Sequence, residues 1–550
     1  TRVAAGLTRG REHAALVEPI DRARRAGVPE AELAYALVAQ ALFDDDLLRG
    51  LQLLAAWDER AARGSDYQLV AGLVLARAGA PDARRRLLAA TRLAPASPLA
   101  EFALARHVAI AGPPDEAAAL ARRFQAAHPG APEGAALVAL AWASGARAGA
   151  TPPEVAQTLT GAAELPRSLR FVPHALRALE VLKAPVTDAA ARLELEAAVA
   201  VAEGPDETCW MGELALDAGA RWAEFAASLA ARVTAVSPHP RAMRLAARAA
   251  LLRVQLPEAE AAARGLDPGE PLSALVGAIG DYERASPLDL AKHLDSLRPP
   301  APASSAAAHA ESGATTTLLW PAMLNSQAIL RGTTLRSEDL VTLGGAPDPW
   351  ARVLAADAAM DVGDLAAARP IVRGPWARDR PERAVRLARL ARYCGGASDA
   401  VYLSGLAVGE PFDRGFDGPP NPLLTAAPLR ARIERLLALV ARKARARAVA
   451  FVGSAGFGEL TPFALVVANS AGGGGGAARE LPDPGALGPD TPLPVRLLIA
   501  RAYGAARDRN AGFTYVQRLV KAGFTNPDVA LAAEGVNLPP VTPRSPCGEP

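Results

Sequence analysis

Side chains able to do chemistry occur in this chain, but they do not stand at the spacings that known reactions need. Gly472 begins a glycine run without the Gly-Lys-Ser/Thr ending of a phosphate-binding loop. Ser454 lies in Gly-Ser-Ala-Gly, not in the Gly-x-Ser-x-Gly spacing of a hydrolase nucleophile, and no histidine can be assigned as its base. The consecutive acids at 44–46 point in different directions, which disfavours a cation site. We therefore predict no catalytic, cofactor or metal site, and we expect a protein that is not an enzyme.

The three cysteines, Cys209, Cys394 and Cys547, are far apart and form no Cys-x-x-Cys pair. No histidine stands at ligand spacing from them, so we expect no zinc or redox centre. Cys209 and Cys394 each follow or precede an aromatic residue and are interpreted as small buried hydrophobic side chains. Cys547 is expected to be exposed in a flexible tail. An odd number leaves at least one thiol unpaired, which favours a reducing compartment and leaves the periplasm open.

Charge is nearly balanced, with 60 basic and 58 acidic side chains, so no overall field attracts nucleic acid or an anionic membrane. Only four of the basic residues are lysines, which indicates the coding bias of a GC-rich genome and a bacterial source. Two local series of basic residues could bind phosphate or an acidic partner, or could form solvated helix faces that pair with acids on neighbouring helices; we favour the second interpretation. The first series is Arg383, Arg386 and Arg389; the second is Arg430, Arg432, Arg435, Arg442, Lys443, Arg445 and Arg447.

The elements that carry these side chains are predicted to be helices. Half of the 550 residues are apolar, yet only 5% are aromatic, and alanine supplies much of the apolar half. Small side chains allow helices to pack closely, whereas a β-sandwich needs more β-branched and aromatic residues. Pairs such as Ser97-Pro98 and Thr461-Pro462 are typical of helix starts, because the hydroxyl caps free N–H groups and proline suits the first turn. The chain also exceeds the usual size of one core.

An internal repeat organises the N-terminal part of the chain. Pro95 and Pro129 lie 34 residues apart, and each closes a similar pattern of apolar and small residues. Such a period is typical of helical-repeat proteins. The first pattern contains Ala71, Gly72, Leu75, Gly79, Ala83, Leu87 and Ala90, and the second contains Leu104, Ala105, Val108, Gly112, Ala117, Ala121 and Phe124.

These marks resemble those of the tetratricopeptide repeat (TPR) family, in which small residues stand where two helices cross and a proline follows the second helix. Looser copies occur at 355–372 and 499–519, and Gly396 follows Gly363 after 33 residues. The resemblance implies a divergent, TPR-like fold: an all-α solenoid of antiparallel helix pairs that forms a superhelix. It also implies a groove, lined by the first helices, that holds a peptide or a partner helix.

Composition shifts predict the domain organisation. We expect a helical-repeat region at 1–297, a Pro/Ala/Ser-rich linker at 298–316 and a second helical-repeat region at 317–470. A Gly/Pro-rich loop at 471–492, a helical pair at 493–538 and a flexible tail at 539–550 complete the prediction. The segment 409–422 forms a further break.

The leading functional hypothesis is a non-catalytic scaffold or adaptor that binds a protein or peptide partner through its helical repeats. Alternatives are a structural subunit of a larger assembly, or a regulatory or accessory region of a larger enzyme, kinase or transcription regulator. No apolar run is long enough to span a bilayer, and the compartment stays open between the cytoplasm and the periplasm or cell envelope of a bacterium. Candidate partner contacts on first helices are Gln68, Glu101, His107, Trp350 and Arg352.

Overall fold

The computed structural model describes residues 13–43, 46–57, 64–80, 82–145, 151–182, 188–236, 239–284, 349–374, 380–409, 426–472, 481–482, 491–545 and 547. Within these ranges every regular element is a helix, and the extended backbone pairs only in an isolated bridge between Asp364 and Ser545. The predicted all-α fold is therefore confirmed for the described residues. The predicted linker at 298–316 and most of the loop at 471–492 lie outside them.

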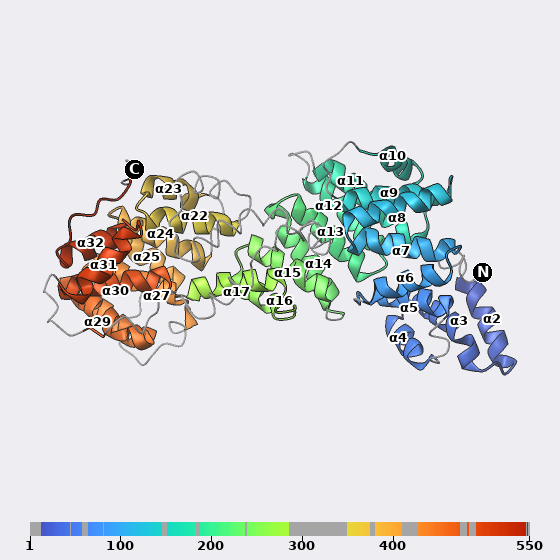
Figure 1. Ribbon diagram of the computed structural model, residues 1–550, viewed down its shortest axis with the longest axis horizontal. Coiled ribbons are helices and arrows are strands. Elements are labelled where there is room, and N and C mark those ends of the chain that lie inside the picture. Colours follow the sequence, from blue (N-terminus) through green and yellow to red (C-terminus); the bar gives the residue numbers. More distant parts are fainter. Residues whose placement is uncertain are drawn as a thin grey trace. The chain divides into compact units, whose positions relative to one another are not determined.

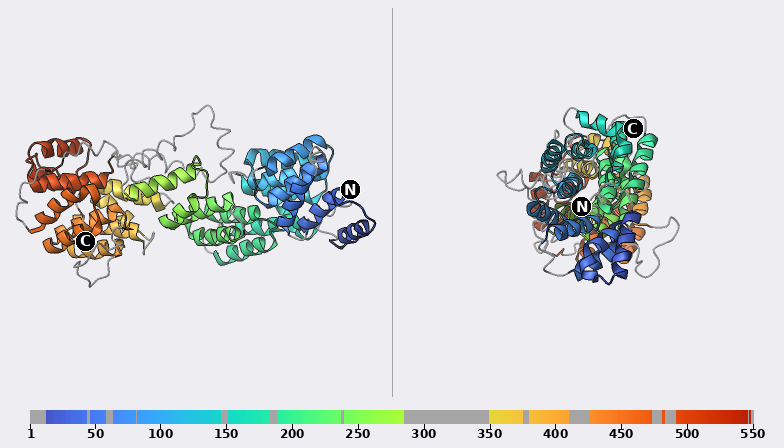
Figure 2. Two further views of the ribbon diagram at one scale, coloured as in Figure 1. Left: turned by 90° about the horizontal axis from the view of Figure 1, so that it is seen from below. Right: turned by 90° about the vertical axis from the view of Figure 1, so that its right-hand side faces the viewer.

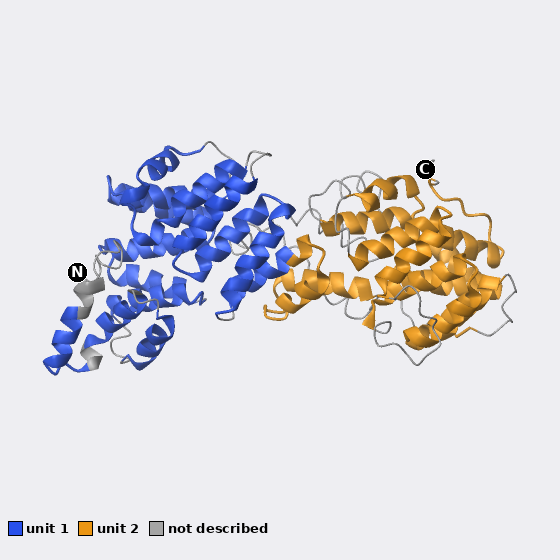
Figure 3. Cartoon of the chain, turned by 180° about the vertical axis from the view of Figure 1, so that it is seen from behind, with its two compact units in different colours: residues 1–249, 299–318 blue, residues 250–298, 319–550 orange. Residues whose placement is uncertain are grey.

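The chain divides into two compact units (Figure 3). Unit 1 comprises residues 1–249 and 299–318, and unit 2 comprises residues 250–298 and 319–550. Each unit has its own hydrophobic cores, so we describe each by itself.

Unit 1 is a succession of short helices joined by tight turns, drawn blue to green in Figures 1 and 2. Consecutive helices pack on each other, and because their connections are short the partners of a pair run antiparallel. One continuous core extends from α5 to α14, and a smaller one lies among α3, α4 and α5. The helices are α2 (His13–Arg25), α3 (Glu30–Phe43), α4 (Leu47–Ala56), α5 (Ser65–Arg77), α6 (Ala83–Leu93), α7 (Pro98–Ala111), α8 (Pro114–Ala127), α9 (Pro132–Ser144), α10 (Pro153–Thr160), α11 (Phe171–Leu182), α12 (Asp188–Val201), α13 (Pro205–Asp217), α14 (Ala223–Thr234) and α15 (Pro240–Leu252), whose residues 250–252 belong to unit 2.

The two sequence repeats coincide with two helix pairs, α5 with α6 and α7 with α8. Gly79 follows α5 with φ +65°, a left-handed conformation that glycine adopts without strain. Pro95 and Pro129 follow the second helix of each pair, as the repeat predicts. Ser97 caps α7, because its hydroxyl accepts the N–H of Ala100 at 3.3 Å. The repeat pattern therefore located these four helices correctly.

Gly72 allows the helices of the first pair to approach closely. A Cβ atom at this position would lie 2.6 Å from Cδ2 and 3.1 Å from the backbone nitrogen of Leu87 on α6. Leu87 is itself fully buried in the core of unit 1, where side chains are closely packed. A glycine is thus required here by packing.

We predict that Gly72→Leu destabilises unit 1 by about 1–3 kcal/mol, because the added side chain forces α5 and α6 apart. Gly453→Leu is the matched control, since Gly453 is also helical but a Cβ there meets no heavy atom within 4 Å. Urea denaturation of both variants, with hydrogen exchange read on α5 and α6 peptides, measures the difference. Equal stability of the two variants would contradict the packing argument.

Unit 2 holds two further cores, one around α17 and α22 and one from α24 to α32. The sequence units at 355–372 and 499–519 fall on the pairs α22 with α23 and α30 with α31, and Gly396 directly precedes α25. The helices are α16 (Leu256–Ala263), α17 (Pro271–Arg284), α22 (Pro349–Asp361), α23 (Leu365–Arg373), α24 (Pro381–Tyr393), α25 (Ala397–Ala407), α27 (Leu429–Ala441), α28 (Arg445–Ala455), α29 (Thr461–Asn469), α30 (Leu493–Ala506), α31 (Ala511–Lys521) and α32 (Pro527–Gly535).

The sequence predicts a helix start at Thr461 and disfavours a cation site at the acids 44–46, and the structure shows what Thr461 and Asp46 do. Thr461 does not cap a helix; it is the first residue of α29, and its hydroxyl donates to the carbonyl of Gly458 at 2.7 Å. Of the acids at 44–46, only Asp46 is described, and its carboxylate caps α4 by accepting the N–H of Arg49. In the described parts of both units no helix is long and apolar enough to cross a membrane.

The interpretation of Cys394 as a buried hydrophobic side chain is wrong. Cys394 is exposed at the end of α24 and forms a disulfide with Cys547, with 5.7 Å between the Cα atoms. Cys209 is the buried free cysteine, and burial raises the pKa of its thiol. The pairing was missed because the two partners are separated by 153 residues and share no sequence pattern.

Candidate functional site

The arginine series of α24 is the most unusual chemical feature of unit 2. Arg383, Arg386 and Arg389 continue to Arg392, one arginine at every third residue. Three residues of an α-helix turn about 300°, so each arginine is rotated by about 60° from the last. The series therefore faces several neighbouring helices in turn, and its guanidinium groups are largely buried. A buried guanidinium must be paired to be tolerated.

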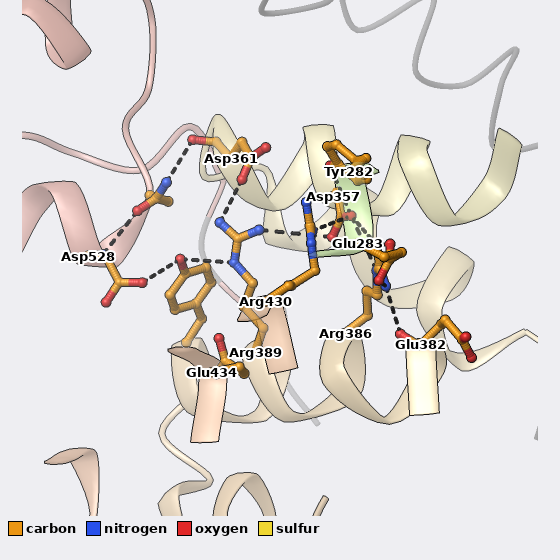
Figure 4. Close-up of polar contacts among 12 residues, drawn as sticks. Tyr282, Glu283, Asp357, Asp361, Glu382, Arg386, Arg389, Arg430, Glu434 and Asp528 are labelled. Atoms are coloured by element: carbon orange, nitrogen blue, oxygen red, sulfur yellow. Dashed lines mark hydrogen bonds and ion pairs between the residues drawn. The ribbon is translucent and has the colours of Figure 1, made fainter. Parts of the chain in front are cut away.

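Arg386 is the most buried of the four, with no exposed surface. It donates to both carboxylate oxygens of Glu283 on α17, at 2.9 and 2.5 Å, and to Oδ2 of Asp357 on α22 at 3.2 and 2.6 Å (Figure 4). Such two-pronged contacts match the planar geometry of arginine. One side chain thus joins three helices.

Asp357 is the centre of this group. Its Oδ2 also accepts from Arg430 on α27 at 2.7 Å and from the hydroxyl of Tyr282 at 3.1 Å. The Arg430 guanidinium lies 4.0 Å from the centre of the Tyr282 ring. Burial alone raises the pKa of Asp357, but Arg386 and Arg430 outweigh burial and lower the pKa to about 2. Asp357 is therefore ionised throughout the physiological range.

A second group surrounds Arg392. It donates to Glu434 on α27 at 2.8 Å and to both carboxylate oxygens of Asp528 on α32 at 2.7 and 2.9 Å. The hydroxyl of Tyr393 also donates to Asp528 at 2.8 Å. Burial raises the pKa of Asp528, but Arg392 reverses this effect and holds the pKa well below its usual range.

Arg389 lies between the two groups. It donates to Asp361 at 2.6 Å and to the hydroxyl of Tyr393 at 3.1 Å. We refer to all of these residues together as the ionic network, and we list them here: Tyr282, Glu283, Asp357, Asp361, Glu382, Arg386, Arg389, Arg392, Tyr393, Arg430, Glu434 and Asp528. It contains four arginines and six acids, and each arginine pairs with at least one carboxylate, which allows so many charges to be buried together.

Glu382 contacts the ionic network through its backbone, because its carbonyl oxygen accepts a hydrogen bond from Arg386 at 3.0 Å. Its Oε2 atom is buried, and among the described residues it has no hydrogen-bond partner. Burial, with a smaller contribution from the charge of nearby Glu283, raises the pKa of Glu382 to about 7. This carboxyl group therefore exchanges its proton near neutral pH.

The hypothesis of solvated arginine faces is correct in one respect and wrong in another. Arg386, Arg389 and Arg392 do pair with acids on neighbouring helices, whereas Arg383 donates to the backbone carbonyls of Val372, Arg373 and Gly374. These side chains lie in the interior of unit 2. The second basic series is split: Arg430 and Arg435 are buried, whereas the turn from Arg442 to Arg447 is exposed. Helical spacing alone does not reveal which side of a helix faces the core when both sides contain arginine.

The candidate partner residues of unit 1 lie on α5 and α7. Gln68 is buried and accepts a hydrogen bond from Arg86 at 3.2 Å. Glu101 is partly exposed and pairs with Arg123 of α8 at 2.8 Å. His107 is largely enclosed, and burial lowers the pKa of its imidazole.

His107 is enclosed because α13 packs against α5 and α7. Arg106 of α7 donates to Glu207 of α13 and, at 3.0 Å, to the carbonyl of Ser168. Arg241 of α15 donates to Glu213 at 2.9 and 2.6 Å and to the carbonyl of Ile110 at 2.9 Å. The inner side of α7, where the sequence predicts a partner, is therefore occupied by later helices of the same unit.

The candidate residues of unit 2 lie in the first turn of α22. Trp350 is 2% exposed and belongs to the core around α17 and α22, whereas Arg352 is partly exposed. These two residues and the three candidates of unit 1 form no common cluster within either unit.

Sequence reasoning missed the acidic half of the ionic network. Asp357 and Asp361 stand four residues apart in α22, where nearly every residue is buried. Carboxylates in such an apolar helix need partners, and this signal could have directed attention to the buried arginines of α24. Glu283 and Asp528 carry no comparable signal.

The ionic network can hold helices in place, and in the described residues no group of side chains forms a metal site. No protein-family model matches this chain, and no curated protein matches it.

Proposed function

We propose that the chain is a divergent, TPR-like helical-repeat protein and that it acts as a non-catalytic scaffold or adaptor for a protein or peptide partner. In unit 1 the first helices α5, α7, α9 and α11 contact one another in succession, and the second helices α6 and α8 contact the first helix of the next pair. This double layer supports a solenoid of stacked pairs.

The observation that carries the proposal is the ionic network. Its contacts between helices join residues 28 to 136 positions apart in the sequence and hold α24 against α17, α22, α27 and α32. Because each guanidinium pairs with one or two particular carboxylates, the angles between the helices are specified more closely than by apolar packing alone. A rigid unit keeps its exposed surfaces in a fixed arrangement. A partner can then bind without the entropic cost of ordering the unit.

The burial of some candidate residues limits which of them can contact a partner. Gln68, His107 and Trp350 pack within their units, so in this proposal they support the surface and do not touch the partner. Glu101 and Arg352 are partly exposed and stay candidate contacts. In this proposal the partner of unit 1 binds on the Glu101 side of α7.

Affinity purification of the tagged full chain from its native cells tests the proposal when two matched variants are included. Glu101→Arg reverses one half of an ion pair on a first helix, and Glu116→Arg does the same on the second helix α8, where Glu116 pairs with Arg84. We expect a partner in a fixed ratio to the wild-type chain and to Glu116→Arg, and at least tenfold less of it with Glu101→Arg. Recovery of the chain alone, or equal loss in both variants, would overturn the proposal.

A further inference from the structure

The described residues after α32 return to the α22–α23 turn. Ser545 donates its N–H to the carbonyl of Gly363 at 3.1 Å and accepts the N–H of Leu365 at 3.2 Å. Pro543 lies directly against Gly363, where a Cβ atom would be 2.9 Å from the Cα of Pro543. We call residues 541–545 and 547 the C-terminal strap. The sequence predicts a flexible tail here, but the strap is held at several points.

The disulfide is the strongest of these attachments. It joins Cys547 to Cys394, the residue that directly follows α24. Cys547 packs against the core around α17 and α22, whereas Cys394 is exposed. A thiolate in solution can therefore reach the Cys394 sulfur.

The turn between α22 and α23, which the strap contacts, also has hydrogen bonds that do not involve the strap. The hydroxyl of Thr525 donates to the carbonyl of Val362 at 2.6 Å, and the side-chain amide of Asn526 donates to the carbonyl of Asp361 at 3.1 Å. The end of α22 thus keeps these partners whether or not the strap is in place. Without the disulfide, the strap would be held by two backbone hydrogen bonds and the packing of Pro543 and Val541. Water competes well for such bonds, and terminal segments fray when they lack stronger ties.

We propose that the C-terminal strap is a redox-controlled latch that opens when a dithiol reductant reduces the disulfide. The reductant attacks the Cys394 sulfur as a thiolate and displaces Cys547, which takes up a proton. The second thiol of the reductant then resolves the mixed disulfide and releases the Cys394 thiol. Two electrons pass to the protein, the dithiol becomes a disulfide, and the strap leaves the Gly363 to Leu365 edge. This inference is independent of the proposed scaffold function.

Limited trypsin digestion of the full chain tests the latch, because Arg544 lies exposed in the strap. Dithiothreitol is the reductant, and the cut after Arg544 is quantified by mass spectrometry after quenching and alkylation. We expect cleavage at Arg544 to be at least tenfold faster in the reduced protein, while cuts within α22 and α24 stay slow. Cys547→Ser should give the fast rate with or without dithiothreitol, and Cys209→Ser should behave as wild type.

A thiol count provides a second, independent readout. In denaturant the protein oxidised with glutathione disulfide should show one free thiol, from Cys209, and the reduced protein should show three. Equal cleavage rates in the two states, or a disulfide that involves Cys209, would overturn the proposal. Cleavage that also accelerates within α22 would overturn it as well, because reduction would then open more than the strap.

Discussion

Arg386→Met should lower the free energy of unfolding of unit 2 by about 3–5 kcal/mol, the typical cost of removing one partner from a buried ion pair. Methionine fills much of the volume but leaves the carboxylates of Glu283 and Asp357 without the guanidinium between them. Both carboxylates are almost completely buried, so water cannot replace the lost partner. Urea denaturation, with hydrogen exchange read on peptides from α22 and α24, measures the loss.

Arg518→Met is the matched control, because Arg518 is an exposed arginine on α31 of the same unit. Its expected change is within about 0.5 kcal/mol, as for most surface substitutions. A charge-specific readout separates lost pairing from lost packing. In Arg386→Met the pKa of Asp357 should rise, so the variant should recover stability as the pH is lowered, and adding Asp357→Asn should restore part of the loss. A loss below about 1 kcal/mol, or one that pH does not change, would contradict the pairing argument.

Glu382→Gln should stabilise unit 2 at pH 8 by as much as about 3 kcal/mol. The pKa of Glu382 is raised from 4.5 to about 7 in the folded chain, a difference of roughly 2.5 units at 1.36 kcal/mol each. Since the folded-state pKa exceeds the unfolded value, the stabilising contribution of the protonated carboxyl is complete below pH 4.5. It is lost as the pH rises through about 7. Glutamine cannot ionise and therefore avoids the loss.

The measurement is urea denaturation of the wild type and the variant between pH 4.5 and 8. The two curves should converge near pH 4.5 and separate progressively toward pH 8. Glu534→Gln serves as the control, since Glu534 is an exposed glutamate on α32, and its stability should follow that of the wild type. Parallel curves for Glu382→Gln and the wild type across the whole range would show that folding does not change the pKa of Glu382, which would contradict this prediction.

Much of the local architecture was predictable from the sequence. The helix pairs α5 with α6 and α7 with α8 were placed by the positions of Gly79, Pro95 and Pro129, because helix ends and tight turns depend on a few residues with special backbone preferences. The requirement for Gly72 was also predictable, since it reflects the crossing of two helices that are neighbours in the sequence.

The candidate site was much less predictable. The arginines of α24 were visible as a series, but their partners Glu283, Asp357 and Asp528 come from three other helices, up to 136 residues away. The local sequence around an acidic residue does not indicate with which distant arginine it will pair. The same reasoning explains why His107 was expected in an open groove and is instead enclosed by α13.

By itself, the sequence determined the helical nature of this protein, the positions of several helix pairs and the small residues at their crossings. These features follow from short-range backbone preferences and from apolar periodicity, which act within one or two turns of a helix. Only the tertiary structure decided which arginines are buried, which carboxylates neutralise them and that Cys394 pairs with Cys547. Those outcomes depend on how distant helices pack, because burial turns an ordinary charged side chain into one that must find a specific partner.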